Sequence, residues 1–280
     1  MFGRSGMTTN TLTAQGDKMT RTIQQLFDLT GKTALVTGGS RGLGLQLAHA
    51  LGEAGAKIML SSRKAPDLEE AVAELQAAGI DARWIVADCA REEDIRRLAD
   101  ETLERVGAVD ILVNNAGAAW GAPAEDHPVQ AWDKVMDLNV RGYFILSQHM
   151  AKHCMIGRRS GSIINVASIA GLGGNSKGMH TIAYNTSKGA VINFTRALAA
   201  EWGRYNIRVN AICPGFFPSK MTAGTFKAIG EEALAARAPL GRLGDAEDLK
   251  GLCALYASDA GKHITGQWLA VDGGVSVIKG

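Results

Sequence analysis

The stretch KTALVTGGSRGLGLQLAHAL, residues 32–51, decides the fold of this chain. It reads as a short buried strand, a glycine-rich turn and an amphipathic helix. Gly38, Gly42 and Gly44 allow a tight turn and a close approach of the backbone to a pyrophosphate. The helix that follows presents free N–H groups and a positive dipole end to such an anion. The spacing is G-x-x-x-G-x-G rather than the commoner G-x-G-x-x-G, so the strand–turn–helix context carries the prediction of a dinucleotide site.

Apolar runs alternate with helical patterns along the rest of the chain. Strands are expected at 33–37, 56–61, 83–87, 110–113, 162–166, 207–212 and 268–271. Helices are expected at 42–54, 67–78, 92–106, 130–156, 185–203 and 245–257. This alternation predicts an α/β fold, namely a single doubly wound Rossmann-type domain with a central parallel sheet flanked by helices. A ligand then lies beyond the carboxyl ends of the strands.

The composition agrees with one soluble α/β domain over residues 23–280. At 280 residues with 46% apolar content, the chain can bury one large core. A net charge of +2 gives no electrostatic reason to bind nucleic acid or a membrane surface. No stretch reaches the length of about 18 apolar residues that a membrane span needs. The segment 1–22 is polar and has no apolar core of a secretory signal, so we expect a disordered extension.

The cysteines and histidines predict no metal site. The four cysteines are scattered without paired spacing, at Cys89, Cys154, Cys213 and Cys253. This usage is typical of a reduced, cytoplasmic protein with no disulfide framework or zinc cluster. His149 and His153 have i, i+4 spacing beside Cys154, but such pairs on a long helix are far more often surface or interface residues.

Three residues in the second half of the chain are chemically useful together. Tyr184 and Lys188 lie in YNTSK, and on a helix they share one face, one turn apart. A nearby ammonium lowers the pKa of a tyrosine from about 10, which lets it exchange a proton with a substrate oxygen. Ser168, after the apolar run SIINVA, can hydrogen-bond the same oxygen. YxxxK alone also fits a chance pair at a helix start, and the glycine-rich turn is what favours the catalytic interpretation.

In this order, the motifs resemble those of the short-chain dehydrogenase/reductase family. The motifs are TGGSRGLG (37–44), Asp88 in VADCA, NNAG (114–117), Asn139 in LNVRG, Ser168, Tyr184 with Lys188, PG (214–215) and VDGG (271–274). The resemblance covers about residues 29–278, and the chain is similar both to 3-oxoacyl-thioester reductases and to gluconate 5-dehydrogenase-like members.

The resemblance implies four catalytic residues. Tyr184 is the general acid and base, Lys188 lowers the pKa of Tyr184, Ser168 orients the substrate oxygen, and Asn139 holds a water that connects Lys188 to solvent. The chemistry implied is hydride transfer between a nicotinamide and a secondary alcohol or ketone carbon.

A cofactor-binding set also follows from the resemblance. Asp88 accepts a hydrogen bond from the adenine amino group, residues 115–117 lie against the adenosine ribose, and Lys188 holds the nicotinamide ribose. Ser219 offers a hydroxyl where the family usually has a threonine, although Pro218 interrupts the loop in this chain. The set comprises Gly38, Ser40, Arg41, Gly42, Leu43, Gly44, Ser62, Arg63, Asp88, Cys89, Asn115, Ala116, Gly117, Tyr184, Lys188, Pro214, Gly215, Phe217 and Ser219.

Charges after the second strand favour NADP(H) over NAD(H). An NAD site usually places an acidic residue there, whereas this chain has Ser62 followed by Arg63. A serine can hydrogen-bond a phosphate and an arginine can pair with it bidentately. Arg41, in the glycine-rich turn, can reach the same phosphate from the other side. If these arginines are only solvated surface charges, NAD(H) remains possible.

The substrate is a small ketone or secondary alcohol whose class the sequence leaves open. The segment 216–239 predicts a helical lid with an apolar side, and three lysines can meet an anion: Lys177, Lys220 and Lys227. A 3-oxoacyl thioester of acyl carrier protein or coenzyme A is favoured, with its chain on the lid and its phosphates on basic residues. A sugar acid such as gluconate is the alternative. The long loop 171–181 shapes the pocket, and His180 can line it.

Two further expectations concern activity and assembly. A catalytically inactive NADP-binding regulator is a remote alternative, and the intact Asn, Ser, Tyr and Lys set argues against it. The resemblance implies a homotetramer, built through the helices 130–156 and 185–203 and through the C-terminal strand.

Overall fold

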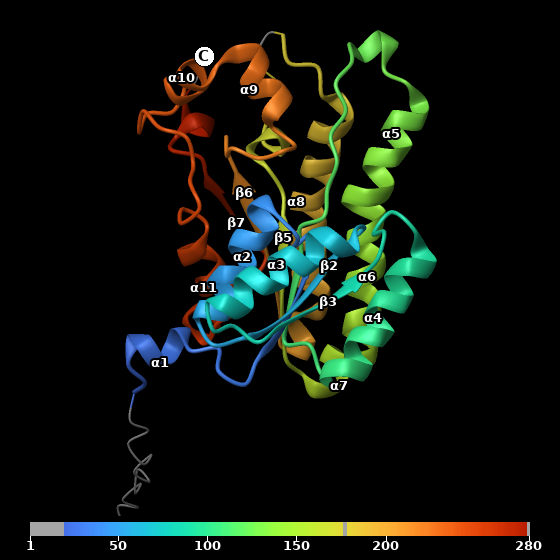
Figure 1. The fold of residues 1–280 in the computed structure, drawn as a ribbon, viewed down its shortest axis with the longest axis vertical. Coiled ribbons are helices and arrows are strands. Elements are labelled where there is room, and N and C mark those ends of the chain that lie inside the picture. The colour runs from blue at the N-terminus through green and yellow to red at the C-terminus, as the bar shows by residue number, and fades with distance from the viewer. Residues whose placement is uncertain (1–19, 176–177, 279–280) are drawn as a thin grey trace, which may run out of the picture.

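A seven-stranded parallel sheet forms the centre of the structure, a computed structural model that describes residues 20–175 and 178–278 (Figure 1). The strands are β1 (Thr33–Thr37), β2 (Lys57–Ser62), β3 (Ala82–Val86), β4 (Ile111–Asn114), β5 (Gly161–Val166), β6 (Ile207–Pro214) and β7 (Trp268–Val271). Their order is β3-β2-β1-β4-β5-β6-β7, and every neighbouring pair is parallel. The predicted doubly wound sheet is confirmed, and each strand lies where it was expected to within two residues at either end.

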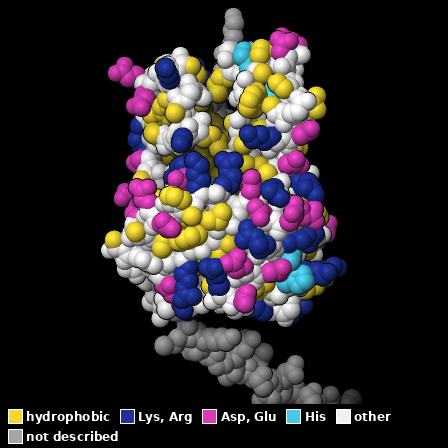
Figure 2. All heavy atoms as spheres, turned by 45° about the vertical axis from the view of Figure 1, so that its right-hand side comes forward, with side chains coloured by type: hydrophobic (Ala, Val, Ile, Leu, Met, Phe, Trp, Pro, Cys, Tyr) yellow, Lys and Arg dark blue, Asp and Glu magenta, His cyan; other side chains and the backbone are white. Residues whose placement is uncertain are grey.

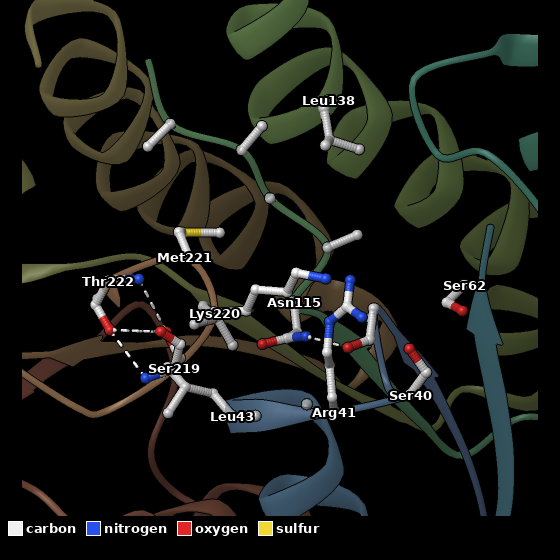
Figure 3. Close-up of a pocket in the computed structure, with 18 of the residues that line it drawn as sticks. Ser40, Arg41, Leu43, Ser62, Asn115, Leu138, Ser219, Lys220, Met221 and Thr222 are labelled. Carbon is white, nitrogen blue, oxygen red and sulfur yellow. Dashed lines mark hydrogen bonds between the residues drawn. The ribbon is translucent and has the colours of Figure 1, made fainter. Parts of the chain in front are cut away.

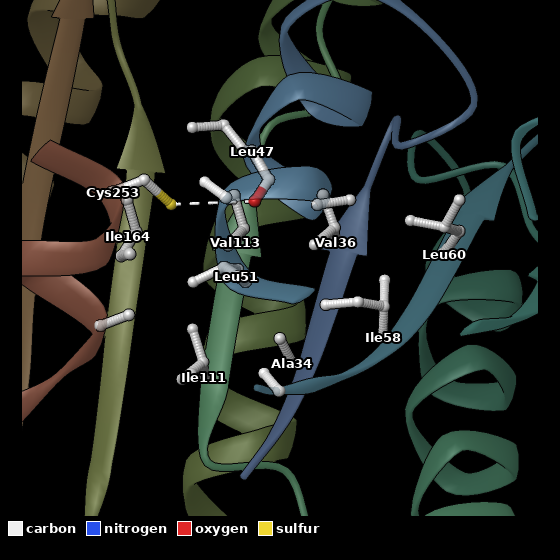
Figure 4. Close-up of a cluster of buried hydrophobic side chains, with 14 of the residues drawn as sticks. Ala34, Val36, Leu47, Leu51, Ile58, Leu60, Ile111, Val113, Ile164 and Cys253 are labelled. Carbon is white, nitrogen blue, oxygen red and sulfur yellow. Dashed lines mark hydrogen bonds between the residues drawn. The ribbon is translucent and has the colours of Figure 1, made fainter. Parts of the chain in front are cut away.

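Helices cover both faces of the sheet because its strands are apolar on both sides. In β1, Ala34 and Val36 pack on one face and Leu35 on the other. The first face is covered by α2 (Gly42–Glu53), α3 (Ala65–Ala77) and α11 (Lys250–Ala257). The second is covered by α4 (Glu92–Val106), α6 (Gly142–Met150) and α8 (Ile182–Trp202). Figure 4 shows the first core, where Leu47 and Leu51 of α2 lie over the strands.

The helix expected at 130–156 is continuous but is not a simple α-helix. It runs through α5 (Val129–Met136), η2 (Asp137–Arg141), α6, η3 (Ala151–Met155) and α7 (Ile156–Arg158), and η2 and η3 are π-helical. A π-helical turn inserts an extra residue into the helical repeat and often marks a functional site. Here η2 contains Asn139, one of the predicted catalytic residues.

Two other helices begin more than two residues away from the predicted start. α8 starts at Ile182 rather than 185, so Tyr184 lies inside its first turn. α11 starts at Lys250 rather than 245. The residues before α11 form turns instead, because the Asp245 carboxylate accepts the backbone N–H of Glu247 and the Asp248 carboxylate accepts that of Asp245. Aspartate side chains that bond the nearby backbone in this way compete with a helix.

The remaining elements are short. They are α1 (Ile23–Phe27), α9 (Ala223–Ile229), α10 (Glu231–Ala235), and the 3₁₀ turns η1 (Ala124–Asp126), η4 (Ile169–Gly171), η5 (Gly203–Tyr205), η6 (Asp259–Gly261) and η7 (Val275–Val277). α1 was not predicted; Thr22 begins it with a capping box to Gln25. Of the N-terminal extension expected over 1–22, residues 1–19 lie outside the described residues. No described helix combines the length and the apolar character needed to cross a membrane.

Candidate active site

A pocket of about 640 Å³ opens at the carboxyl ends of the strands. Every residue of the predicted cofactor-binding set lines it, together with Ser168. Figure 2 shows a hollow between two lobes of the surface, with hydrophobic side chains inside it and Lys and Arg side chains at its lower end. Asn139 does not line the pocket, but its neighbour Leu138 does. The topology thus brings residues from six strand ends to one place.

The glycine-rich turn leaves a space that suits a pyrophosphate. A Cβ on Gly44 would lie 2.3 Å from the carbonyl oxygen of Gly38, and one on Gly38 would lie 2.9 Å from Ala116, so the turn packs tightly against the β4 loop. Gly42 instead has a φ of +56°, and a Cβ there would meet only the Ser219 side chain, at 3.8 Å. Arg41, the residue before α2, makes no side-chain cap, so the first N–H groups of the helix are left for an anion.

Asn115 holds this turn in place. Its Nδ2 donates to the carbonyl oxygens of Thr37 at 2.9 Å and Gly38 at 3.1 Å. Its backbone N–H donates to the Thr37 hydroxyl at 3.0 Å. The NNAG motif therefore fixes the glycine-rich turn, a role that the sequence interpretation did not assign to it.

The far end of the pocket holds the residues predicted to bind a 2′-phosphate. Ser62 has a buried hydroxyl with no hydrogen-bond partner. Within residues 20–175 and 178–278, the side chain of Arg63 makes no ion pair, and it lines the pocket. Arg41 is different, because its Nη1 lies 2.9 Å from Oδ2 of Asp67. Asp67 also lines the pocket and was missed from the sequence. Figure 3 shows Ser62 on β2 and Arg41 projecting into the pocket.

Asp88 and Cys89 line the middle of the pocket. Asp88 is held in a tight turn, in which its Oδ1 accepts the backbone N–H of Ala90 at 3.0 Å. The Asp88 backbone N–H donates to the carboxylate of Asp94, at the start of α4. Burial raises the pKa of the Cys89 thiol to about 12, so that it stays protonated at neutral pH.

α8 places Tyr184 and Lys188 one turn apart, as predicted. The Lys188 Nζ lies 5.6 Å from the centre of the Tyr184 ring and 5.7 Å from that of Tyr143. It donates a 2.7 Å hydrogen bond to the carbonyl oxygen of Val166. Ser168 comes two residues after β5, and its hydroxyl accepts the backbone N–H of Ala170. These side chains thus meet above β5 at the floor of the pocket.

The pKa of Tyr184 departs from the prediction. Burial raises the pKa above its ordinary value of 10, hydrogen bonding to Ser168 lowers it, and Cys213 raises it again. Burial likewise lowers the pKa of Lys188 to about 8. The predicted fall in the tyrosine pKa is therefore wrong for this structure, because the loss of solvation outweighs the hydrogen bond to Ser168. The sequence spacing showed the pair but not the depth at which it is buried.

Asn139 acts as a clamp behind the pocket. Its Oδ1 accepts the backbone N–H of Ala118 at 2.8 Å, and its Nδ2 donates to the Ala118 carbonyl at 2.9 Å. The same Nδ2 donates to the hydroxyl of Ser187 at 2.9 Å. The side chain thus ties the β4 loop to α8 beside Lys188. The water expected at Asn139 stays a prediction.

The loop after β6 closes the other side of the pocket. The Ser219 N–H donates to the Thr222 hydroxyl at 2.9 Å, and that hydroxyl donates to the carbonyl of Phe217. Thr222 lines the pocket and was missed, although the spacing Ser219-x-x-Thr222 is typical of such a turn. Figure 3 shows the dashed bonds between Ser219 and Thr222.

The predicted lid is helical, as α9 and α10, and reaches the pocket through Lys220 and Met221. Lys227 lies on α9 and does not line the pocket. Lys177 lies outside the described residues. His180 lines a second cavity of about 230 Å³, with Asn175, Thr181 and Asn185 among its other residues, and not the main pocket.

The histidines near Cys154 form no metal site in the described part of the chain. His149 Nε2 lies 2.6 Å from the Asp100 carboxylate, and its ring centre lies 4.4 Å from that of His153, with the two rings tilted by 35°. No group of three His, Cys, Asp or Glu residues in that part is placed to hold a metal ion.

Known proteins can now be compared with this geometry. The profile of the family described as short chain dehydrogenase matches residues 32–230. The chain belongs to this family. It is therefore an oxidoreductase that acts on CH–OH groups.

Two relatives and one solved structure match nearly the whole chain. It is 41% identical to the rhamnolipids biosynthesis 3-oxoacyl-(acyl-carrier-protein) reductase of Pseudomonas aeruginosa, over 89% of this chain and 97% of that protein. It is 37% identical to the gluconate 5-dehydrogenase of Gluconobacter oxydans, over 90% and 97% respectively. The crystal structure of a gluconate 5-dehydrogenase from Burkholderia cenocepacia with NADP and tartrate has a TM-score of 0.86 at 36% identity, covering 91% of this chain and 99% of that one.

Proposed function

We propose that the protein is an NADP(H)-dependent oxidoreductase that interconverts a ketone and a secondary alcohol, with a 3-oxoacyl thioester as its favoured substrate. The observation that carries the proposal is the pocket itself, where Ser168, Tyr184 and Lys188 share one lining with the glycine-rich turn. A hydride donor and a proton donor must meet at one carbonyl in such a reaction. This lining supports that arrangement.

Each side chain of the site has its own role in the reaction. When bound, the cofactor supplies or accepts the hydride at its nicotinamide. In the reductive direction Tyr184 gives its phenolic proton to the substrate oxygen, and the Ser168 hydroxyl orients that oxygen. Because burial raises the pKa of Tyr184, the residue carries its proton at neutral pH, which favours reduction. Lys188, whose pKa is lowered to about 8, is still mostly charged at pH 7 and holds the nicotinamide ribose.

The preference for NADP(H) is supported by the far end of the pocket. The unpartnered hydroxyl of Ser62 and the unpaired guanidinium of Arg63, as described above, offer a donor and a positive charge at one place. A phosphate is the ligand that uses both. The crystallised gluconate 5-dehydrogenase relative was solved with NADP bound, which agrees with this assignment.

Side chains at the mouth of the pocket support the proposed substrate class. Met221, which is half exposed, gives the lining apolar surface, and Lys220 adds a cation. A 3-oxoacyl chain uses the apolar surface and the phosphates of its carrier use the cation, in line with the Pseudomonas relative. A sugar acid is the second candidate, because a lysine can pair with its carboxylate and because two relatives are gluconate 5-dehydrogenases.

The test is an NADPH-oxidation assay with matched ketones. We expect turnover with an acetoacetyl thioester, less with a 5-keto sugar acid, and little with NADH in place of NADPH. Tyr184→Phe serves as the inactive control. Turnover of the sugar acid alone would select the second candidate, and no turnover of any ketone with either cofactor would contradict the proposal.

We also propose that copies of the chain associate, as a homotetramer. Large apolar side chains are exposed on the two long helices, including Val129, Phe144 and Ile182 at 67%, 46% and 41%. Leu269 and Val277 are exposed near the C-terminus. Burying such side chains is a reason for association. A mass of one chain, 29.6 kDa, by light scattering at micromolar concentration would contradict it.

A further inference from the structure

A contact beside Tyr184 joins α8 to η4, the short turn that follows Ser168. A Cβ on Gly171 would lie 2.5 Å from the carbonyl carbon of Lys188, so the two elements pack backbone to backbone. Ser168 begins η4, and its hydroxyl accepts the N–H of Ala170 at 3.1 Å. The place of that hydroxyl relative to the Tyr184 phenol therefore depends on how η4 sits on α8.

Asn185 is the side chain that crosses this contact. Its Nδ2 donates to the carbonyl oxygen of Ala170 at 2.8 Å. Its Oδ1 accepts from the Thr181 hydroxyl at 2.9 Å, and its backbone N–H donates to the Thr181 carbonyl at 3.0 Å. One side chain thus ties the first turn of α8, which carries Tyr184, to the segment that begins with Ser168.

Asn175 completes the network from outside. Its Oδ1 accepts from Asn185 Nδ2 at 2.9 Å, and its Nδ2 donates to the Thr181 hydroxyl at 2.8 Å. Asn175 is exposed, and no hydrogen bond of its side chain within the described residues reaches η4. It therefore serves as a matched control, with the same chemical group in the same network but without the link to Ser168.

The link matters because Ser168 and Tyr184 line the same pocket. Hydrogen bonding to Ser168 lowers the pKa of the Tyr184 phenol, against the opposite effect of burial. A shift of η4 by a few tenths of an ångström weakens such a bond, which depends steeply on distance and angle. Replacing Asn185 by alanine would also remove the side-chain amide that donates to the Ala170 carbonyl oxygen.

We propose that Asn185 is a positioning residue for the reaction, which sets the Ser168 hydroxyl against the Tyr184 phenol by tying η4 to α8. This inference rests on the proposed ketone reductase activity. Asn185 lies outside the lining of the main pocket and lines the second cavity instead. Its proposed effect therefore passes through Ser168, which separates it from a general loss of stability.

The test measures kinetics of the full-length protein with Asn185→Ala and Asn175→Ala. We expect kcat to fall about tenfold in Asn185→Ala, the loss given by one well-placed hydrogen bond, with the Kd for NADPH within about twofold of wild type. In alcohol oxidation, which needs the phenolate, the pH profile of Asn185→Ala should move to higher pH. Asn175→Ala should keep the wild-type kcat and pH profile.

A Ser168→Ala background distinguishes positioning from a structural role. If Asn185 acts through Ser168, the kcat of the double variant should be within about twofold of the kcat of Ser168→Ala alone. Fully additive effects, or a wild-type pH profile in Asn185→Ala, would overturn the inference. Should Asn185→Ala not fold, Asn185→Leu gives the same readout, because it keeps a similar side-chain volume and removes the donor to Ala170 without adding a charge. A wild type without ketone reductase activity would overturn the proposed function as well, whereas an active wild type and an inactive Tyr184→Phe confine any failure to Asn185.

Discussion

The guanidinium of Arg41 is paired with the carboxylate of Asp67 across the mouth of the pocket, at 2.9 Å. Both residues line the pocket, and both side chains are partly exposed. Arg41 was expected to bind the 2′-phosphate of NADP from the side opposite Arg63. The ion pair means that the phosphate must compete with Asp67 for this cation.

The first prediction follows from that competition. Asp67→Asn should raise the affinity for NADPH, because it frees Arg41 and removes a negative charge near the phosphate. Exposed pairs contribute about 0.2–1 kcal/mol, so we expect about a 1.5- to 5-fold lower Kd for NADPH. The Kd for NADH, which lacks the phosphate, should change less. Fluorescence titration with both cofactors measures the two constants.

Asp81→Asn provides the control for this experiment. Asp81 also pairs with basic residues on the surface, Lys57 and Arg83, but it does not line the pocket. It should leave both cofactor affinities unchanged. Equal changes for NADPH and NADH in Asp67→Asn would contradict a role for Asp67 at the phosphate.

The second prediction concerns Arg63. Arg63→Ala should weaken the binding of NADPH by about ten- to more than a hundredfold, since a charge-assisted hydrogen bond contributes about 1.5–3 kcal/mol. NADH binding should hardly change. Ser62→Asp should go further and favour NADH, because a carboxylate repels the phosphate and binds free ribose hydroxyls. Kinetics with both cofactors decide the matter, and a wild type that already prefers NADH would refute the phosphate site.

The third prediction tests the proton donor. Tyr184→Phe keeps the ring and removes the proton, so kcat should fall by roughly 10²–10⁴-fold, the range of general acid–base catalysis. Binding of NADPH should persist, because the glycine-rich turn is untouched. Steady-state kinetics together with a fluorescence titration separate the two effects. Near wild-type turnover in this variant would remove Tyr184 from the mechanism.

The sequence predicted the fold well because local patterns control it. About ten consecutive residues are enough to predict β1 and the turn at Gly38. The alternation of apolar runs with helical patterns predicts the parallel sheet. Boundaries were less accurate where side chains intervene. The Asp245 and Asp248 carboxylates bond the backbone before α11 and delay that helix, and spacing alone does not show such bonds.

The sequence predicted which residues form the site, but not their pKa shifts or ion pairs. Motif spacing brought Tyr184 and Lys188 to one helix face, and the structure places them together. Their surroundings come from residues far apart in the sequence, such as Tyr143 beside the Lys188 ammonium and Cys213, which raises the pKa of Tyr184. Burial among such residues reverses the expected change in the tyrosine pKa. The Arg41–Asp67 pair was missed for a similar reason, since 26 positions separate its members.

The last prediction uses the buried charge of Lys188. Burial lowers its pKa from 10.5 to about 8, which corresponds to a cost of about 3 kcal/mol for the charged form in the folded state. Lys188→Met removes that cost and also the hydrogen bond to Val166, so the free energy of unfolding at pH 7 should rise by about 1–3 kcal/mol. Activity should be lost.

Between pH 8 and 10.5 the unfolded wild type binds more protons at this group than the folded wild type, so the wild type gains stability with rising pH there. The advantage of Lys188→Met over the wild type should therefore shrink across that window. Denaturant unfolding of both proteins at pH 7 and at pH 10 measures it, and a difference that stays constant with pH would show that Lys188 is not buried with a depressed pKa.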